Sequence, residues 1–200
     1  AVVAVVGGFV RYRLSTSAAS LARRWRVGGG DEGDSDGDSP LAALLVTAHP
    51  DDECMFFAPT VSALQAAGHR VLLLCLSTGD AEGLGGVRRG ELLRAAEAMG
   101  IDRDDVTVVD DAALQDGMDT HWPSSVVAAQ VALWLDEFEG RRDGGGGGVI
   151  DKVVSFDDGG VSGHGNHIAC ARGVSLVARE RGIPALQLES TALPRKYAGV

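Results

Sequence analysis

The sequence has few cysteines, fewer basic than acidic residues, and no apolar run long enough to cross a membrane. Its three cysteines, Cys54, Cys75 and Cys170, form no CxxC pair, and we expect buried free thiols in a reducing compartment such as the cytosol. Lysine and arginine number 18 against 28 aspartates and glutamates, a formal charge of −10, which argues against a nucleic-acid-binding surface. The remaining composition, 45% hydrophobic and 23% charged, is typical of a globular protein, and 200 residues are enough for one ordinary α/β domain or for two small domains, of which we assume one.

The first ten residues are all apolar or glycine, and five arginines follow: Arg11, Arg13, Arg23, Arg24 and Arg26. Ten helical residues would cover roughly half of a ~30 Å hydrocarbon core, so this run alone does not span a bilayer. A trimmed signal anchor with its arginines on the cytosolic side, an Arg-rich transit peptide and a disordered start all remain open. An acidic linker follows at 31–39, so we divide the chain into a start and linker, 1–40, and a folded domain, 41–200. The ending "RKYAGV" has no obvious closing element, which is compatible with a trimmed carboxyl end.

Strand patterns alternate with helix patterns along the domain. Apolar runs of strand length lie at 41–47, 71–77, 106–110, 149–156 and 184–191. Helical patterns lie between them, at 55–67, 88–99, 124–138 and 167–181. This order predicts an α/β fold with a mostly parallel sheet and helices on both faces.

Polar clusters follow four of these strands: "AHPDDE", "TGDAEGLGG", "DDAALQDGMD" and "DDGGVSGHGNH". Functional sites of parallel α/β sheets form at the carboxyl ends of the strands. We therefore expect the chemistry of the protein at this one edge of the sheet.

The first and last clusters carry groups that bind divalent cations. His49, Asp51, Asp52 and Glu53 offer an imidazole and three carboxylates, and "HGNH" places two further histidines three residues apart. Two histidines and one aspartate, with a fourth position open for water, form a common catalytic zinc centre. Each cluster alone is also explained by acids at a helix start or by a chance HxxH, but their joint appearance at one edge favours a metal site.

The paired motifs "TAHPDDE" and "GGVSGHGNH" resemble the N-acetylglucosaminyl-phosphatidylinositol de-N-acetylase family, the LmbE-like zinc deacetylases. The resemblance covers roughly residues 41–196 and implies a Rossmann-like catalytic domain. It implies removal of an N-acetyl group from a glycolipid, an early step of GPI-anchor biosynthesis, with Zn²⁺ or another divalent metal as cofactor. It also implies a membrane surface or a single anchor as partner, at the endoplasmic reticulum with the catalytic domain facing the cytosol. It leaves protein partners unidentified.

Matched position by position, the resemblance assigns roles to seven residues. The zinc ligands fall on His49, Asp52 and His167, and the general base falls on Asp51. The histidine that steadies the oxyanion falls on His164, which we expect to be protonated.

Two further matches concern the substrate. Arg88 would meet its phosphate or inositol side, and Asp116 would hold sugar hydroxyls. An arginine opening a helix and an aspartate in a turn explain the same positions without substrate. Glu53, Asp157 and Asp158 are candidates for orienting a histidine.

Three alternatives differ in function. The first keeps the chemistry but acts on a soluble N-acetylglucosaminyl conjugate, and the second is a non-catalytic module that binds metal and sugar. The intact Asp51 argues against the second. The third, a dinucleotide enzyme, is disfavoured because "GLGG" lacks the GxGxxG frame. A nucleophilic Cys54 has no helper residue at a suggestive spacing.

Overall fold

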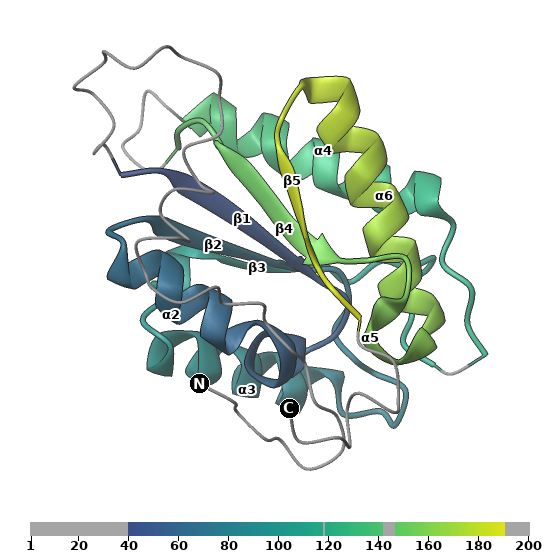
Figure 1. Ribbon diagram of the computed structural model, residues 1–200. Coiled ribbons are helices and arrows are strands. Elements are labelled where there is room, and N and C mark those ends of the chain that lie inside the picture. The colour runs from purple at the N-terminus through teal and green to yellow at the C-terminus, as the bar shows by residue number, and fades with distance from the viewer. Residues whose placement is uncertain (1–39, 118, 142–146, 191–200) are drawn as a thin grey trace, which may run out of the picture.

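The computed structural model describes residues 40–117, 119–141 and 147–190 (Figure 1). The expectations for the apolar start and the acidic linker concern residues 1–39, and the expectation of a trimmed carboxyl end concerns residues 191–200. Both ranges lie outside the described residues. Within the described residues, no helix combines the length and the apolar character that a membrane crossing requires.

In the part of the chain that the structure describes, five parallel strands form one sheet in the order β3-β2-β1-β4-β5. The strands are β1 (Ala42–Thr47), β2 (Arg70–Cys75), β3 (Val106–Val108), β4 (Lys152–Phe156) and β5 (Ala185–Leu188). The central strands β1, β2 and β4 are almost continuously apolar and buried, as expected where helices cover both faces of a parallel sheet. The predicted α/β fold is confirmed.

Helices alternate with these strands. The longer ones are α2 (Ala58–Ala66), α3 (Gly85–Ala98), α4 (Ser124–Gly140) and α6 (Gly165–Arg181). Shorter turns are the π-helix η1 (Glu53–Phe57), the 3₁₀-helix η2 (Arg103–Asp105) and α5 (Gly160–Gly163). All four predicted helices are present, and the first is preceded by a π-helix that begins at Glu53, the last residue of the acidic motif.

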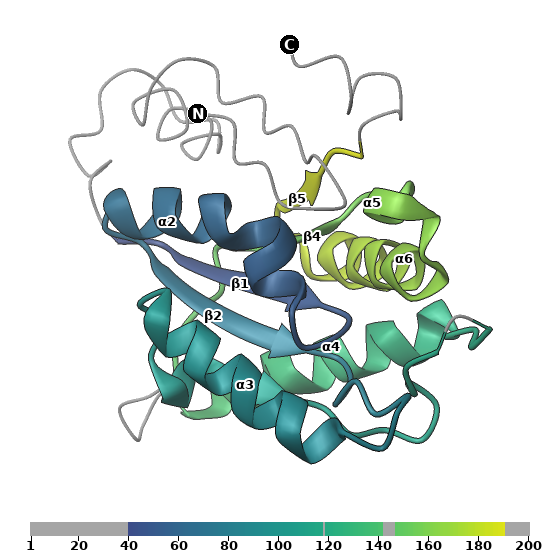
Figure 2. The same cartoon turned by 90° about the horizontal axis from the view of Figure 1, so that it is seen from below.

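The helices form a layer on each face of the sheet. Figure 1 shows α2 and α3 on one side and α4 and α6 on the other. Figure 2 shows α4 and α6 side by side, and these two helices make extensive contact. This arrangement follows from right-handed crossovers, because the chain moves outward from β1 to β3 in one direction and from β4 to β5 in the other.

The switch in direction places β1 beside β4 in the middle of the sheet. Such a switch point opens a crevice beyond the carboxyl ends of the two strands, where α/β proteins bind ligands. The loop after β1 carries "AHPDDE" and the loop after β4 carries "DDGGVSGHGNH". The strand order therefore brings together the two motifs that the sequence singled out.

The core supports this edge from below. Among the large side chains with less than 2% exposure are Phe57 and Phe156, whose rings meet edge to face at 5.1 Å between centroids. Buried serines continue the core to the carboxyl edge: Ser155 Oγ donates to the Val46 carbonyl and Ser77 Oγ to the Ala48 carbonyl. The loop bearing His49 thus begins on a tightly held strand end.

Candidate metal centre and active site

Asp52 is almost completely buried, with only 1% of its surface exposed. Its Oδ2 accepts hydrogen bonds from the amides of Ala48, at 2.9 Å, and His49, at 2.8 Å. Its Oδ1 lies 3.1 Å from Nε2 of His167, a residue of the distant second motif. Burial alone would raise the pKa of Asp52, but His167 and His49 outweigh it and lower the pKa. Asp52 is therefore a carboxylate with one oxygen fixed by the backbone and the other turned into the site.

His167 presents a buried nitrogen to this carboxylate. Its Nδ1 lies 3.1 Å from the Gly160 carbonyl, which can only accept, so Nδ1 carries the proton. Its Nε2 is buried and makes no hydrogen bond, although Asp52 Oδ1 is close by. The ring is also held by stacking on Phe156, with centroids 4.1 Å apart and planes 4° from parallel. Burial lowers the pKa of His167, but the neighbouring Asp52 outweighs this and raises it.

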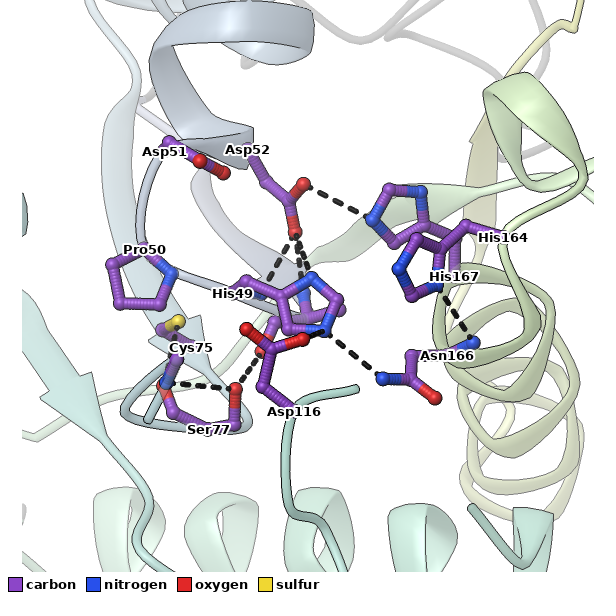
Figure 3. A network of polar contacts seen from close by, with 12 residues as sticks. His49, Pro50, Asp51, Asp52, Cys75, Ser77, Asp116, His164, Asn166 and His167 are labelled. Carbon is purple, nitrogen blue, oxygen red and sulfur yellow. Dashed lines mark hydrogen bonds and ion pairs between the residues drawn. The ribbon is translucent and has the colours of Figure 1, made fainter. Parts of the chain in front are cut away.

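The His49 ring lies between the carboxylates of Asp52 and Asp116, as Figure 3 shows. Its Nε2 is 3.2 Å from Asp116 Oδ1 and 3.0 Å from Asn166 Nδ2. The carboxylate of Asp116 only accepts, which favours a proton on Nε2 and leaves the Nδ1 lone pair facing Asp52. The Asn166 amide suits this tautomer when its oxygen, which is buried without a partner, is turned to Nε2. Burial lowers the pKa of His49 to about 4, so the ring is neutral and able to bind a cation.

These donors fit a divalent metal. One ligand atom from each of His49, Asp52 and His167 lies within 4.8 Å of the other two. The orphaned Nε2 of His167 beside an ionised carboxylate is the feature that a cation would satisfy, and a His₂Asp set with space for water suits catalytic zinc.

His49 also belongs to a second such group, with Asp116 and His164. There the carboxylate of Asp116 is already paired with the Arg88 guanidinium at 3.0 Å, whose charge would repel a second cation. The first group is therefore the better candidate for the metal centre.

Asp51, the predicted base, projects beside this centre from a strained backbone. Its φ of 118° is rare for a residue other than glycine, a type of strain that costs about 1–3 kcal/mol and clusters at functional sites. Glu53 holds the conformation, because its Oε2 accepts from the Asp51 amide at 3.0 Å. Burial, assisted by the charge of Asp52, raises the pKa of Asp51 to about 6, while Arg88 acts against the rise. A carboxylate with this pKa is suited to accept a proton near neutral pH.

Arg88 ties three strand-end loops together. Its Nη2 donates to the Pro50 carbonyl at 2.7 Å and to Asp51 Oδ2 at 3.0 Å. Its Nη1 donates to the Gly79 carbonyl at 2.8 Å and to Asp116 Oδ2 at 3.0 Å. The loops after β1, β2 and β3 thus share one guanidinium, which holds Asp51 directly and His49 through Asp116. The role of Arg88 and Asp116 in binding substrate remains a prediction.

His164, the predicted oxyanion donor, lies beside both histidines of the metal group. Its ring centroid is 4.7 Å from that of His167 and 5.0 Å from that of His49. Its Nδ1 accepts from the Asn166 amide at the start of α6, which leaves the proton on Nε2. Burial and the neighbouring His167 lower the pKa of His164. The expected protonated ring is therefore corrected: His164 is a neutral N–H donor.

The structure corrects three other expectations. Cys54 is exposed rather than buried, and desolvation together with Glu53 raises the pKa of its thiol to about 11, which makes it a poor nucleophile. Glu53 orients the backbone of Asp51 and not His49. Asp157 bonds to the chain near the end of β5, and Asp158 is exposed 4.0 Å from Arg172, so neither orients a histidine directly. All three cysteines are free, as predicted.

Sequence reasoning did not single out Asn166 or Phe156. Asn166 is fully buried against His49, and its position inside "HGNH" was an available signal. Phe156 ends β4 and stacks on His167, which no local pattern reveals. Trp122 is also buried, with 6% of its surface exposed, and its ring centroid lies 5.6 Å from that of His49.

Fold and site together define an α/β protein with a candidate divalent-metal centre at the switch point of a parallel sheet. Residues 44–178 match the family described as PIG-L: GlcNAc-PI de-N-acetylase, and the chain belongs to this family.

Individual relatives agree with this placement. The chain is 41% identical over 168 residues to the probable N-acetylglucosaminyl-phosphatidylinositol de-N-acetylase of Schizosaccharomyces pombe, covering 82% of this chain and 64% of the relative. It is 40% identical over 158 residues to the N-acetylglucosaminyl-phosphatidylinositol de-N-acetylase of Bos taurus, covering 77% and 58%. The chain thus spans less than two thirds of either relative.

Solved structures share the fold. The N,N'-diacetylchitobiose deacetylase from Pyrococcus horikoshii superposes with a TM-score of 0.52 at 17% identity, covering 76% of this chain and 58% of that one. At this identity the likeness concerns the fold alone, and it confirms the Rossmann-like architecture.

Proposed function

We propose that this chain carries the catalytic site of a metal-dependent hydrolase that removes the N-acetyl group from N-acetylglucosaminyl-phosphatidylinositol, an early step of GPI-anchor biosynthesis. The observation that carries the proposal is the convergence of His49, Asp52 and His167 around the unpartnered Nε2 of His167, with Asp51 alongside. Family membership and the names of the two curated relatives support the choice of substrate.

The cofactor in this proposal is Zn²⁺, or another divalent metal, held by His49, Asp52 and His167. Bound there, the metal would supply Lewis-acid chemistry, polarising the acetamide carbonyl and making a water acidic near neutral pH. Asp51 takes the proton of the attacking water, since its carboxylate is ionised above about pH 6 and Arg88 fixes its direction.

The remaining steps also use groups of this chain. His164 donates its Nε2–H to the oxyanion of the tetrahedral intermediate, and loss of one such donor typically costs about 3–4 kcal/mol of barrier. Asp51 then delivers the proton that it took from the water to the amide nitrogen as the C–N bond breaks. Acetate and a free glucosamine are the products. In this proposal Arg88 and Asp116 also face the phosphate or inositol side and the sugar hydroxyls.

The decisive experiment measures acetate release from a synthetic, detergent-dispersed N-acetylglucosaminyl-phosphatidylinositol. We expect release that stops with a chelator and returns with Zn²⁺. Asp51→Asn should keep the metal but lose about 10²–10⁴-fold in turnover. Chelator-resistant release, or full turnover by Asp51→Asn, would contradict the mechanism. Release from a soluble N-acetylglucosaminyl conjugate in preference to the glycolipid would move the function to the soluble substrate.

We further propose that the protein works at the endoplasmic reticulum membrane with this domain facing the cytosol. The apolar start with its following arginines supports this placement. Cell fractionation with protease protection tests it: the domain should sediment with microsomes and be cleaved by protease without detergent. Protection of the domain inside the vesicles would refute the orientation.

A further inference from the structure

The loop between β4 and α6 contains a strained turn directly before the histidines. Val161 has φ 63° and ψ −51°, close to the classic γ-turn, which is rare and unfavourable for a β-branched residue. Gly160 beside it has φ 55°. Such a backbone persists only where surrounding contacts determine it.

The contacts that hold this turn come from the ends of two neighbouring strands. Asp157 follows β4, and Ser190 lies two residues beyond β5. The Asp157 carboxylate accepts from Ser190 Oγ and from the Ser190 amide, each at 2.5 Å, and from the Gly159 amide at 3.0 Å. Ser190 Oγ in turn accepts from the Val161 amide at 2.8 Å. One hydroxyl and one carboxylate thus connect the strained turn to the sheet.

Glycine is required where Ser190 meets the loop. A Cβ on Gly159 would lie 2.7 Å from both Cβ and Oγ of Ser190, closer than side chains pack. Gly159 has a φ of −82°, which any residue adopts, so its small size and not its conformation matters here. The serine is therefore seated directly against the loop.

This turn reaches the candidate metal centre through one carbonyl. Gly160 lies between the two residues that the serine and aspartate hold, and its carbonyl accepts from His167 Nδ1. That hydrogen bond fixes the tautomer of His167 and turns its bare Nε2 toward Asp52. A shift of the turn would release the ring from this orientation.

We propose that Asp157 and Ser190 are positioning residues that hold the 159–161 turn and, through the Gly160 carbonyl, orient His167 as a metal ligand. The metal-binding part of this inference rests on the proposed function. Ser190 lies outside the residues matched to the family, 44–178, and no motif in the sequence marks it.

The test compares Ser190→Ala and Asp157→Ala with the control Asp158→Ala, which removes the adjacent but exposed carboxylate. Affinity for Zn²⁺ and Co²⁺ is measured on the purified protein by competition with a chromogenic chelator. We call Ser190→Ala and Asp157→Ala the brace variants. We expect both to bind the metal ions about 10–100-fold more weakly than the wild type, which is the usual effect of losing a group that orients a metal-ligating histidine. The control should bind like the wild type.

A second readout does not depend on metal. In ¹⁵N-labelled metal-free protein, at a pH high enough for the His167 ring to be neutral, the wild type should show the Nδ1–H tautomer, and Ser190→Ala should show a mixture. Unchanged metal affinity and tautomer in both folded brace variants would overturn the proposal, as would an equal loss in Asp158→Ala. If Ser190→Ala does not fold, Gly159→Ala displaces the serine without deleting a polar group and should give the same two effects.

Acetate release is recorded separately from these measurements. Suppose that Ser190→Ala and Asp157→Ala bind metal more weakly than the wild type, but that the wild type releases no acetate. This result would support the positioning role and contradict the proposed function. Normal acetate release by the wild type, together with unchanged metal affinity in both variants, would support the proposed function and contradict the positioning role.

Discussion

Alanine at Gly79 should disrupt the Arg88 contacts without altering Arg88 itself. Gly79 has φ 69°, and a Cβ there would lie 2.7 Å from Arg88 Cζ and 2.9 Å from Pro50 Cδ. Gly83, in the same loop, has φ 73°, but a Cβ there would have no neighbouring atom within 4 Å. Gly83→Ala is therefore a matched control with the same backbone strain and no collision.

The expected loss in the free energy of unfolding is larger for Gly79→Ala than for Gly83→Ala. Positive φ costs an alanine about 1–2 kcal/mol, and both variants carry this cost. Gly79→Ala should also displace Arg88 Nη1 from the Gly79 carbonyl and from Asp116, whose side chain is only 14% exposed. Each hydrogen bond involving a charged group contributes about 1.5–3 kcal/mol, and partial exposure of Arg88 reduces this, so we expect about 2–3 kcal/mol beyond the control.

The assays are urea unfolding and acetate release. Because Arg88 also holds Asp51, we expect Gly79→Ala to lose about 10²-fold in kcat, the usual effect of misplacing a reacting group by about 1 Å. Gly83→Ala should keep most of its turnover. Equal stability and turnover in the two variants would refute the loop-holding role of Arg88. A rise in KM with unchanged kcat in Gly79→Ala would instead indicate that Arg88 acts mainly on the substrate.

Three further predictions concern pH, metal and thiol chemistry. Since only ionised Asp51 accepts a proton, turnover should rise with pH to a plateau, with a midpoint at or below about pH 6. Arg88→Gln removes a positive charge that lowers the pKa of Asp51, so the midpoint should move to higher pH. A shift of the midpoint to lower pH would contradict the assignment of Asp51 as the base. Zn²⁺ at about 100 times its Kd should raise the free energy of unfolding in urea by about 2.7 kcal/mol, and His167→Ala should lose this increase. An equal increase in the variant would exclude His167 as a ligand. Cys54→Ser should leave acetate release unchanged, because partial desolvation and the neighbouring Glu53 raise the pKa of the Cys54 thiol to about 11. A large loss of acetate release would support Cys54 as a nucleophile.

The sequence was sufficient for features that depend on nearby residues. The apolar runs before His49 and before Asp157 predicted buried strands, because side chains only a few positions apart decide whether a segment can be covered on both faces. The same reasoning placed the two polar motifs at strand ends, and the resemblance to a known family assigned their roles.

Only the tertiary structure decided which groups meet. His49 and Asn166 are 117 residues apart and come into contact because β1 and β4 are neighbours at the switch point, an order that no local pattern encodes. The four hydrogen bonds of Arg88 and the support of Val161 by Ser190 likewise join separate loops. Hydrogen bonds between distant segments depend on how whole strands and helices pack, and this is why the sequence named candidate ligands but not the contacts that hold them in place.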